Sequence, residues 1–121
     1  IVVDDMISSG DSMIEVAAHL KKMGAKRIFV FATFGLFCNG SEIFDKAYAN
    51  GDISRIFTTN LIYCPEEIKN KPWYRQVNMC KYVSLLIDTL NHDESINSVI
   101  NPVKKIHAYI DHAVAEGKVK I

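Results

Sequence analysis

The sequence predicts an α/β protein with a partial parallel sheet and flanking helices. Short β-branched runs alternate along the 121 residues with longer stretches in which apolar residues recur at helical spacing. This alternation is typical of βαβ units. In addition, the segment Arg27–Thr33 is almost continuously apolar, as expected of a parallel strand that is covered on both faces.

The first expected strand is Ile1–Asp4, and the first expected helix begins near Ser12. Ser12 and Glu15 have the spacing of a capping box, and Gly24 is suited to end the helix. Arg27–Thr33 is then the second strand. One face of the first helix is apolar, and it carries Met13, Val16, Ala17 and Leu20.

A second helix is expected over about Ser41–Asn50, with Asn39 as a candidate cap and Gly51 as the stop. Ile53–Asn60 has the composition of a third strand. Tyr63–Pro72 contains two prolines and several charges, which indicates an exposed loop.

The last third of the chain predicts an edge strand and two helices. Trp73–Met79 is the candidate edge strand, and Asn101 followed by Pro102 is typical of a helix start. We expect Glu116–Ile121 to be a frayed end. The apolar stripes of the two helices are Val83, Leu86, Ile87 and Leu90, and then Val103, Ile106, Ile110 and Ala113 or Val114.

The composition argues against several classes of partner. Residues 1–60 carry 6 basic and 7 acidic side chains and residues 61–121 carry 8 and 7, so electrostatic binding of nucleic acid or of a membrane surface is not expected. No apolar run approaches the roughly 20 residues that cross a bilayer. The three cysteines lack a C-x-x-C spacing, which predicts reduced thiols and a cytoplasmic protein. Because the chain opens on Ile1 inside a strand pattern, we expect a piece of a longer protein.

The segment Asp4–Ser12 is the candidate binding site. It joins the first strand to the first helix, and ligands of open α/β sheets bind at the carboxyl ends of strands. Asp4 and Asp5 can accept hydrogen bonds from adjacent sugar hydroxyls. Serine hydroxyls and the backbone N–H groups of a helix N-terminus suit a phosphate. The alternative is purely structural, with serines that cap the helix and carboxylates that solvate a strand end.

The segment Asp4–Ser12 resembles the ribose-phosphate loop of the type I phosphoribosyltransferase fold. Further segments narrow the resemblance to the ribose-phosphate pyrophosphokinase family, also called phosphoribosyl diphosphate synthetase, in a divergent bacterial form. Together they span residues 1–100, which leaves 101–121 as a C-terminal helix and tail; all of 1–121 would form the C-terminal part of a phosphoribosyltransferase-type domain. The further segments are Gly24–Arg27, Ala32–Phe37, Thr58–Ile62 and Asn91–Val99.

The chain departs from the family pattern at four positions. Ser8 stands where the common loop has Asp, and Asp11 stands where it has Gly. Phe34 replaces a His, and Tyr63 replaces a Pro. Asp11 puts a carboxylate near the expected phosphate, which is unfavourable unless the side chain points away.

The resemblance implies transfer of a diphosphoryl group from ATP to ribose 5-phosphate, with Mg²⁺ as cofactor, giving phosphoribosyl diphosphate and AMP. It implies that Asp4 and Asp5 hold the ribose hydroxyls, directly or through Mg²⁺, and that the 5-phosphate is bound by Ser8, Ser9, Gly10 and Ser12. No catalytic residue is assigned within the chain. The ATP-binding residues, the metal-binding His and the basic catalytic loop of the family precede this loop, so we expect the piece alone to be inactive. Assembly into dimers and hexamers is also implied.

Two alternatives remain open. A salvage phosphoribosyltransferase would share the loop, and a non-catalytic regulatory homologue of the synthetase would retain phosphate binding without turnover. The remaining histidines and cysteines are expected to be surface or packing residues, because none has the spacing of a metal site or a neighbouring base.

Overall fold

The computed structural model describes residues 1–119, with residue 98 described by its backbone alone. Two compact units divide the chain, Ile1–Met79 and Cys80–Ile121. The elements of the first unit are β1 (Val2–Ile7), α1 (Asp11–Lys22), β2 (Phe29–Gly35), α2 (Glu42–Ala49), β3 (Arg55–Thr59), α3 (Glu66–Lys69) and β4 (Tyr74–Val77). Those of the second are α4 (Cys80–Asn91), α5 (Asn97–Ile100) and α6 (Val103–Ala115).

The sheet of the first unit is fully parallel, with the strand order β1-β2-β3-β4. Val30 in β2 lies in register with Val2 on one side and Ile56 on the other, and Ile56 is in register with Tyr74. The prediction of a parallel α/β sheet is confirmed, and β4 is an edge strand as expected. All four carboxyl ends therefore lie along one edge of the sheet.

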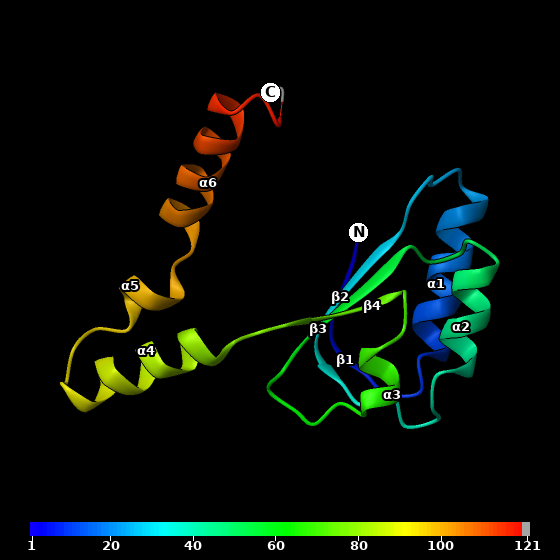
Figure 1. Ribbon diagram of the computed structural model, residues 1–121, viewed down its shortest axis with the longest axis horizontal. Helices are drawn as coiled ribbons and strands as arrows, with labels where there is room; N and C mark the ends of the chain where they lie inside the picture. Colours follow the sequence, from blue (N-terminus) through cyan, green and yellow to red (C-terminus); the bar gives the residue numbers. More distant parts are fainter. Residues whose placement is uncertain (120–121) are drawn as a thin grey trace. The chain divides into compact units, whose positions relative to one another are not determined.

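Helices α1 and α2 lie side by side over one face of this sheet (Figure 1). The sequence builds this layer by placing small residues, such as Ala17 and Ala47, where each helix meets the strands. The centre of the core consists of Val30, Ala32, Ile56, Trp73 and Tyr74 from the strands and their flanks, and Met13, Ala17, Phe44, Ala47 and Ile68 from the helices.

The opposite face of the sheet differs from the prediction. Phe31 is 38% exposed and stacks on Phe57 of the neighbouring strand, with ring centroids 4.7 Å apart. In the unit formed by residues 1–79, which is described throughout, no helix covers this face. The expectation of two covered faces is therefore wrong for this unit, since an apolar run does not distinguish a strand covered twice from one that exposes its aromatic side chains.

The start of α1 also differs from the prediction. The helix begins at Asp11, and its N-cap is Gly10 with φ 93°. Ser12 is therefore inside the helix, and within the described chain no side chain caps this N-terminus. Two features require glycine at position 10. A Cβ there would collide with the ring of Phe44, and the backbone has a left-handed φ.

The predicted helix stops are confirmed. After α1, Gly24 has φ 97°, its N–H donates to the Lys21 carbonyl, and the Ala25 N–H donates to the Leu20 carbonyl, which is a Schellman motif. Gly51 ends α2 in the same way. The start of α2 is different from the expectation, since its N-cap is Ser41 and not Asn39.

Asp45 in α2 anchors the segment after β3. It accepts hydrogen bonds from Trp73 Nε1 at 2.7 Å and from Lys71 Nζ at 2.8 Å. Burial raises the pKa of Asp45, but the hydrogen bonds from Lys71, Trp73 and Ser41 outweigh it, so the pKa lies below its ordinary value of 3.8. The stabilisation is thus present above about pH 3.8 and is lost as the pH falls through the folded-state pKa.

The predicted loop Tyr63–Pro72 is not wholly exposed. It contains α3, and it buries Cys64 and Ile68 at 2% and 3% exposure. Glu66, Glu67 and Lys69 of this short helix are charged, so the sequence does not indicate that Cys64 and Ile68 are buried.

The second unit contains the two amphipathic helices predicted for it, α4 and α6. The last helix starts one residue later than Asn101–Pro102 predicts, since its N-cap is Pro102, and the Asn101 side chain accepts the Val103 N–H at 3.1 Å. Residues 116–118 close α6 through the left-handed Gly117, while 120–121 of the predicted frayed end lie outside the described residues. Of the helices described here, none has the length and apolar character needed to cross a membrane.

Replacement of Asp45 tests the anchor. Asp45→Ala should lower the free energy of unfolding by about 2 kcal/mol, because the N–H of Trp73, which is 0% exposed, loses its acceptor. Asp45→Asn keeps an acceptor for Trp73 and should cost about half as much. Urea unfolding followed by tryptophan fluorescence measures both. Equal losses for the two variants would contradict the assignment.

Alanine replacements at Gly10 and Gly24 separate backbone strain from steric collision. The two residues have nearly equal φ values of 93° and 97°, but a Cβ at Gly24 meets nothing within 4 Å. Gly24→Ala should cost about 1 kcal/mol, and Gly10→Ala about 3 kcal/mol or more because it also displaces Phe44. Thermal unfolding measures the two losses. Similar values would show that Phe44 does not restrict Gly10.

Candidate functional site

The turn formed by Ser8, Ser9 and Gly10 connects β1 to α1 at the carboxyl edge of the sheet. Its backbone is held at both ends. The Ser8 carbonyl accepts the Cys38 N–H at 3.0 Å, and the Gly10 carbonyl accepts the Ile14 N–H at 2.9 Å. We call Ser8–Gly10 the β1–α1 loop; its position is therefore fixed by the fold.

The N-terminus of α1 gives this loop the capacity to bind an anion. Within the described residues no side chain caps the helix, so its first N–H groups and the positive end of its dipole are available. The hydroxyl side chains of Ser8 and Ser12 are exposed, and Ser9 is half-buried. These groups together have the donors that a phosphate requires, while the alternative that Ser9 and Ser12 cap the helix is wrong.

Asp11 opposes the positive potential of the helix end. It is exposed and occupies the first turn of α1. A carboxylate at this position stabilises the helix itself but competes electrostatically with a second anion. Asp11 thus makes this helix end less favourable for a second anion than the backbone N–H groups alone would make it.

Asp4 and Asp5 lie farther from the β1–α1 loop than the sequence suggests, because β1 is longer than predicted. The predicted first strand ends at Asp4, but β1 continues to Ile7, so both carboxylates are inside the strand. Consecutive strand residues point to opposite faces. Both are exposed, and Asp4 Oδ1 accepts the Asp5 N–H at 2.8 Å. The pair therefore offers one carboxylate to each side of β1.

The carboxyl ends of the other strands are tied together beside the loop. Thr59 Oγ1 donates to the Thr33 carbonyl at 2.6 Å, and the Met79 N–H donates to Asn60 Oδ1 at 2.8 Å. Strand β2 continues to Gly35, beyond its predicted end at Thr33, and Phe34 pairs with Met6. These hydrogen bonds hold the carboxyl ends of β2, β3 and β4 together beside the β1–α1 loop.

Tyr74 lies below this edge, with its hydroxyl 2.8 Å from Thr58 Oγ1 in a buried hydrogen bond. Burial, together with a contact to Cys64, raises the pKa of Tyr74 to about 12. The phenol is therefore protonated at neutral pH and acts as a packing group.

Sequence reasoning missed the turn that follows β2. Leu36 and Cys38 donate their N–H groups to the carbonyls of Ile7 and Ser8, at 2.9 and 3.0 Å. The contact between this turn and the β1–α1 loop could have been expected from the strand order, because the segments that follow two adjacent parallel strands lie side by side.

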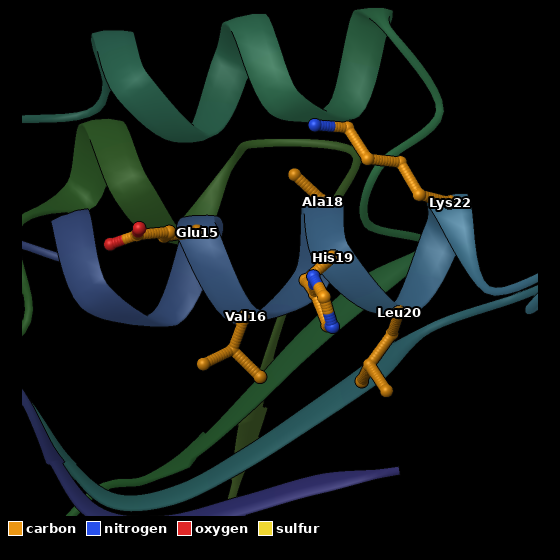
Figure 2. Close-up of a pocket in the computed structure, with 6 residues that line it drawn as sticks. All are labelled: Glu15, Val16, Ala18, His19, Leu20 and Lys22. Atoms are coloured by element: carbon orange, nitrogen blue, oxygen red, sulfur yellow. The ribbon is translucent and has the colours of Figure 1, made fainter.

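A groove of about 430 Å³ lies elsewhere, along α1. Figure 2 shows Val16 and Leu20 on the side of the helix nearer the strands, and Lys22 beside α2. The lining comes from this one helix alone, from Glu15 to Lys22. The groove is separate from the β1–α1 loop. Among the described residues no three His, Cys, Asp or Glu side chains gather into a metal cluster.

Comparison with known proteins relates this chain to one family. The sequence model described as the phosphoribosyl synthetase-associated domain matches residues 1–101. The ribose-phosphate pyrophosphokinase of Haemophilus influenzae is 32% identical over 101 residues, which are 84% of this chain and 31% of that protein. The enzyme of the same name from Mycoplasmopsis pulmonis is 30% identical over 99 residues, or 82% of this chain and 30% of its own length.

Among solved structures, the phosphoribosylpyrophosphate synthetase of Mycobacterium smegmatis has the same fold. It superposes with a TM-score of 0.63 and 22% identity over 75% of this chain and 29% of its own. The chain thus spans about three-tenths of the length of these relatives. With a family match that extends from β1 through α5, the chain belongs to the phosphoribosyl synthetase-associated domain family.

Proposed function

We propose that this chain supplies the ribose 5-phosphate-binding part of a ribose-phosphate diphosphokinase. The reaction transfers the diphosphoryl group of ATP to the anomeric hydroxyl of ribose 5-phosphate and gives phosphoribosyl diphosphate and AMP. The observation that carries this proposal is the β1–α1 loop, which combines an uncapped helix N-terminus with serine hydroxyls and two acidic residues in the preceding strand.

Each part of the substrate has a matching group. The 5-phosphate is assigned to the loop residues Ser8, Ser9 and Gly10 and to Ser12, where N–H and O–H donors surround an anion. The ribose hydroxyls are assigned to Asp4 and Asp5, which are exposed acceptors. The two carboxylates point to opposite sides of β1. We therefore assign the direct contact with the ribose hydroxyls to one of the two carboxylates and not to both together.

Mg²⁺ fits the acidic pair. Magnesium is bound through one or two carboxylates together with substrate oxygens, rather than by a dedicated protein cage. Asp4 or Asp5 would hold it, and the ion would neutralise negative charge on the substrates. The reaction needs such positioning and charge neutralisation more than covalent catalysis.

The proposal extends to the remaining partners. ATP is bound mainly by residues outside this chain, in keeping with the three-tenths of the relatives' length that it spans. We further propose a homo-oligomeric protein of the cytoplasm. The free thiols of Cys38 and Cys64 support a reducing compartment.

The loop assignment is tested by calorimetric binding of ribose 5-phosphate to the protein that contains this chain. Asp5→Asn and Ser9→Ala should each weaken binding by roughly 10-fold or more, because the first removes the negative charge of a hydrogen-bond acceptor and the second removes a hydroxyl. The matched controls are Asp52→Asn, before β3 at the opposite edge of the sheet, and Ser84→Ala in α4. Unchanged affinity in both site variants would refute the loop assignment.

A regulatory homologue is the second candidate, and it is favoured by the exposed carboxylate of Asp11 in the first turn of α1. A salvage phosphoribosyltransferase is less favoured, since the family match continues to residue 101, far beyond the loop.

Turnover distinguishes the two remaining candidates. If the protein that contains this chain is a synthetase, it should release AMP from ATP only when ribose 5-phosphate and Mg²⁺ are both present. Coupled spectrophotometry measures the release. Binding of ribose 5-phosphate without AMP release would establish the regulatory alternative instead.

A further inference from the structure

The turn formed by Leu36, Phe37 and Cys38 lies directly against the β1–α1 loop. Ile7 pairs with Gly35 at the last register position of β1 and β2, so the two chains leave the sheet side by side. The N–H groups of Leu36 and Cys38 then donate to the Ile7 and Ser8 carbonyls. No side chain in the described residues caps α1. The hydrogen bonds that hold the loop therefore come from the neighbouring turn.

The backbone of Phe37 makes this support possible. Its φ is 49°, a left-handed value that is costly for a residue with a Cβ. The ring is 5% exposed and meets Phe44 and Tyr74 edge-on, with centroids 5.2 and 5.7 Å apart. Gly35 leaves room for it, since a Cβ there would lie 2.6 Å from Phe37 Cε2. Aromatic packing therefore holds a strained backbone that directs the Cys38 N–H at Ser8.

The side chains of the turn and the loop also meet. Ser8 Oγ and Cys38 Sγ share a hydrogen bond 3.6 Å long, between two exposed residues 30 positions apart. The rotamer of Ser8 decides whether its hydroxyl points toward a ligand on the helix N-terminus. The hydrogen bond to Cys38 Sγ restricts that choice.

We propose that the turn Leu36–Cys38 positions the β1–α1 loop for phosphate binding, with the Cys38 side chain setting the direction of the Ser8 hydroxyl. This inference rests on the proposed function and adds a positioning residue to it. Cys38 acts through Ser8 and makes no contact with substrate.

The test is the affinity for ribose 5-phosphate of the protein that contains this chain, measured by calorimetry. Cys38→Ala should raise the Kd on the order of threefold to tenfold, the effect of one lost hydrogen bond. The melting temperature should stay the same, because Cys38 is exposed. Cys38→Ser restores a hydrogen-bonding group and should return the Kd to within about twofold of the original value.

A double-mutant cycle makes the test specific. In a Ser8→Ala background, Cys38→Ala should have no further effect on the Kd, because its partner is already gone. Ile53→Ala is the structural control. Ile53 is 2% exposed and lies before β3, at the amino end of the sheet, so this variant should lower the melting temperature and leave the Kd unchanged.

The outcomes separate the two proposals. A wild-type protein that does not bind ribose 5-phosphate overturns both. Normal binding by wild type with an unchanged Kd for Cys38→Ala, or independent effects of Ser8 and Cys38, overturns the positioning role and leaves the proposed function standing.

Discussion

The contact between the Phe44 ring and the backbone of Gly10 is the constraint on which the rest of the first unit depends. It brings α2 against the start of α1, and it excludes every residue with a Cβ from the N-cap. Because Gly10 has a left-handed φ, the chain turns from strand to helix without a capping side chain. The open helix end that we assign to phosphate is therefore a product of core packing.

This contact is one end of a continuous buried cluster. Phe44 packs on Trp73 with ring centroids 5.3 Å apart, and Phe37 meets both rings, at 5.2 and 6.1 Å. The Trp73 N–H is in turn held by Asp45, one residue after Phe44. A single helix turn of α2 thus fixes both the entrance to β4 and the loop after β1, so the stability of the core and the geometry of the loop depend on the same residues.

The parallel sheet, the order of its elements and the glycine stops at Gly24 and Gly51 were predictable from the sequence, because apolar periodicity and left-handed glycines act locally. The helix start at Gly10 was not, since the capping-box pattern at Ser12 is outweighed by a tertiary contact with Phe44. The loop residues of the candidate site were found through their spacing and residue types. The support from Leu36–Cys38 was not found, because the hydrogen bonds that define it join residues about 30 positions apart.

The two acidic residues of β1 have an effect beyond ligand binding. Strand β1 is at the edge of the sheet described here, and such an edge offers unpaired backbone groups to any other strand. Two copies of β1 placed edge to edge would bring four carboxylates together within a six-residue strand, and like charges on adjacent strands repel. Within the sheet described here, Asp4 and Asp5 therefore make edge-to-edge pairing of two β1 strands unfavourable.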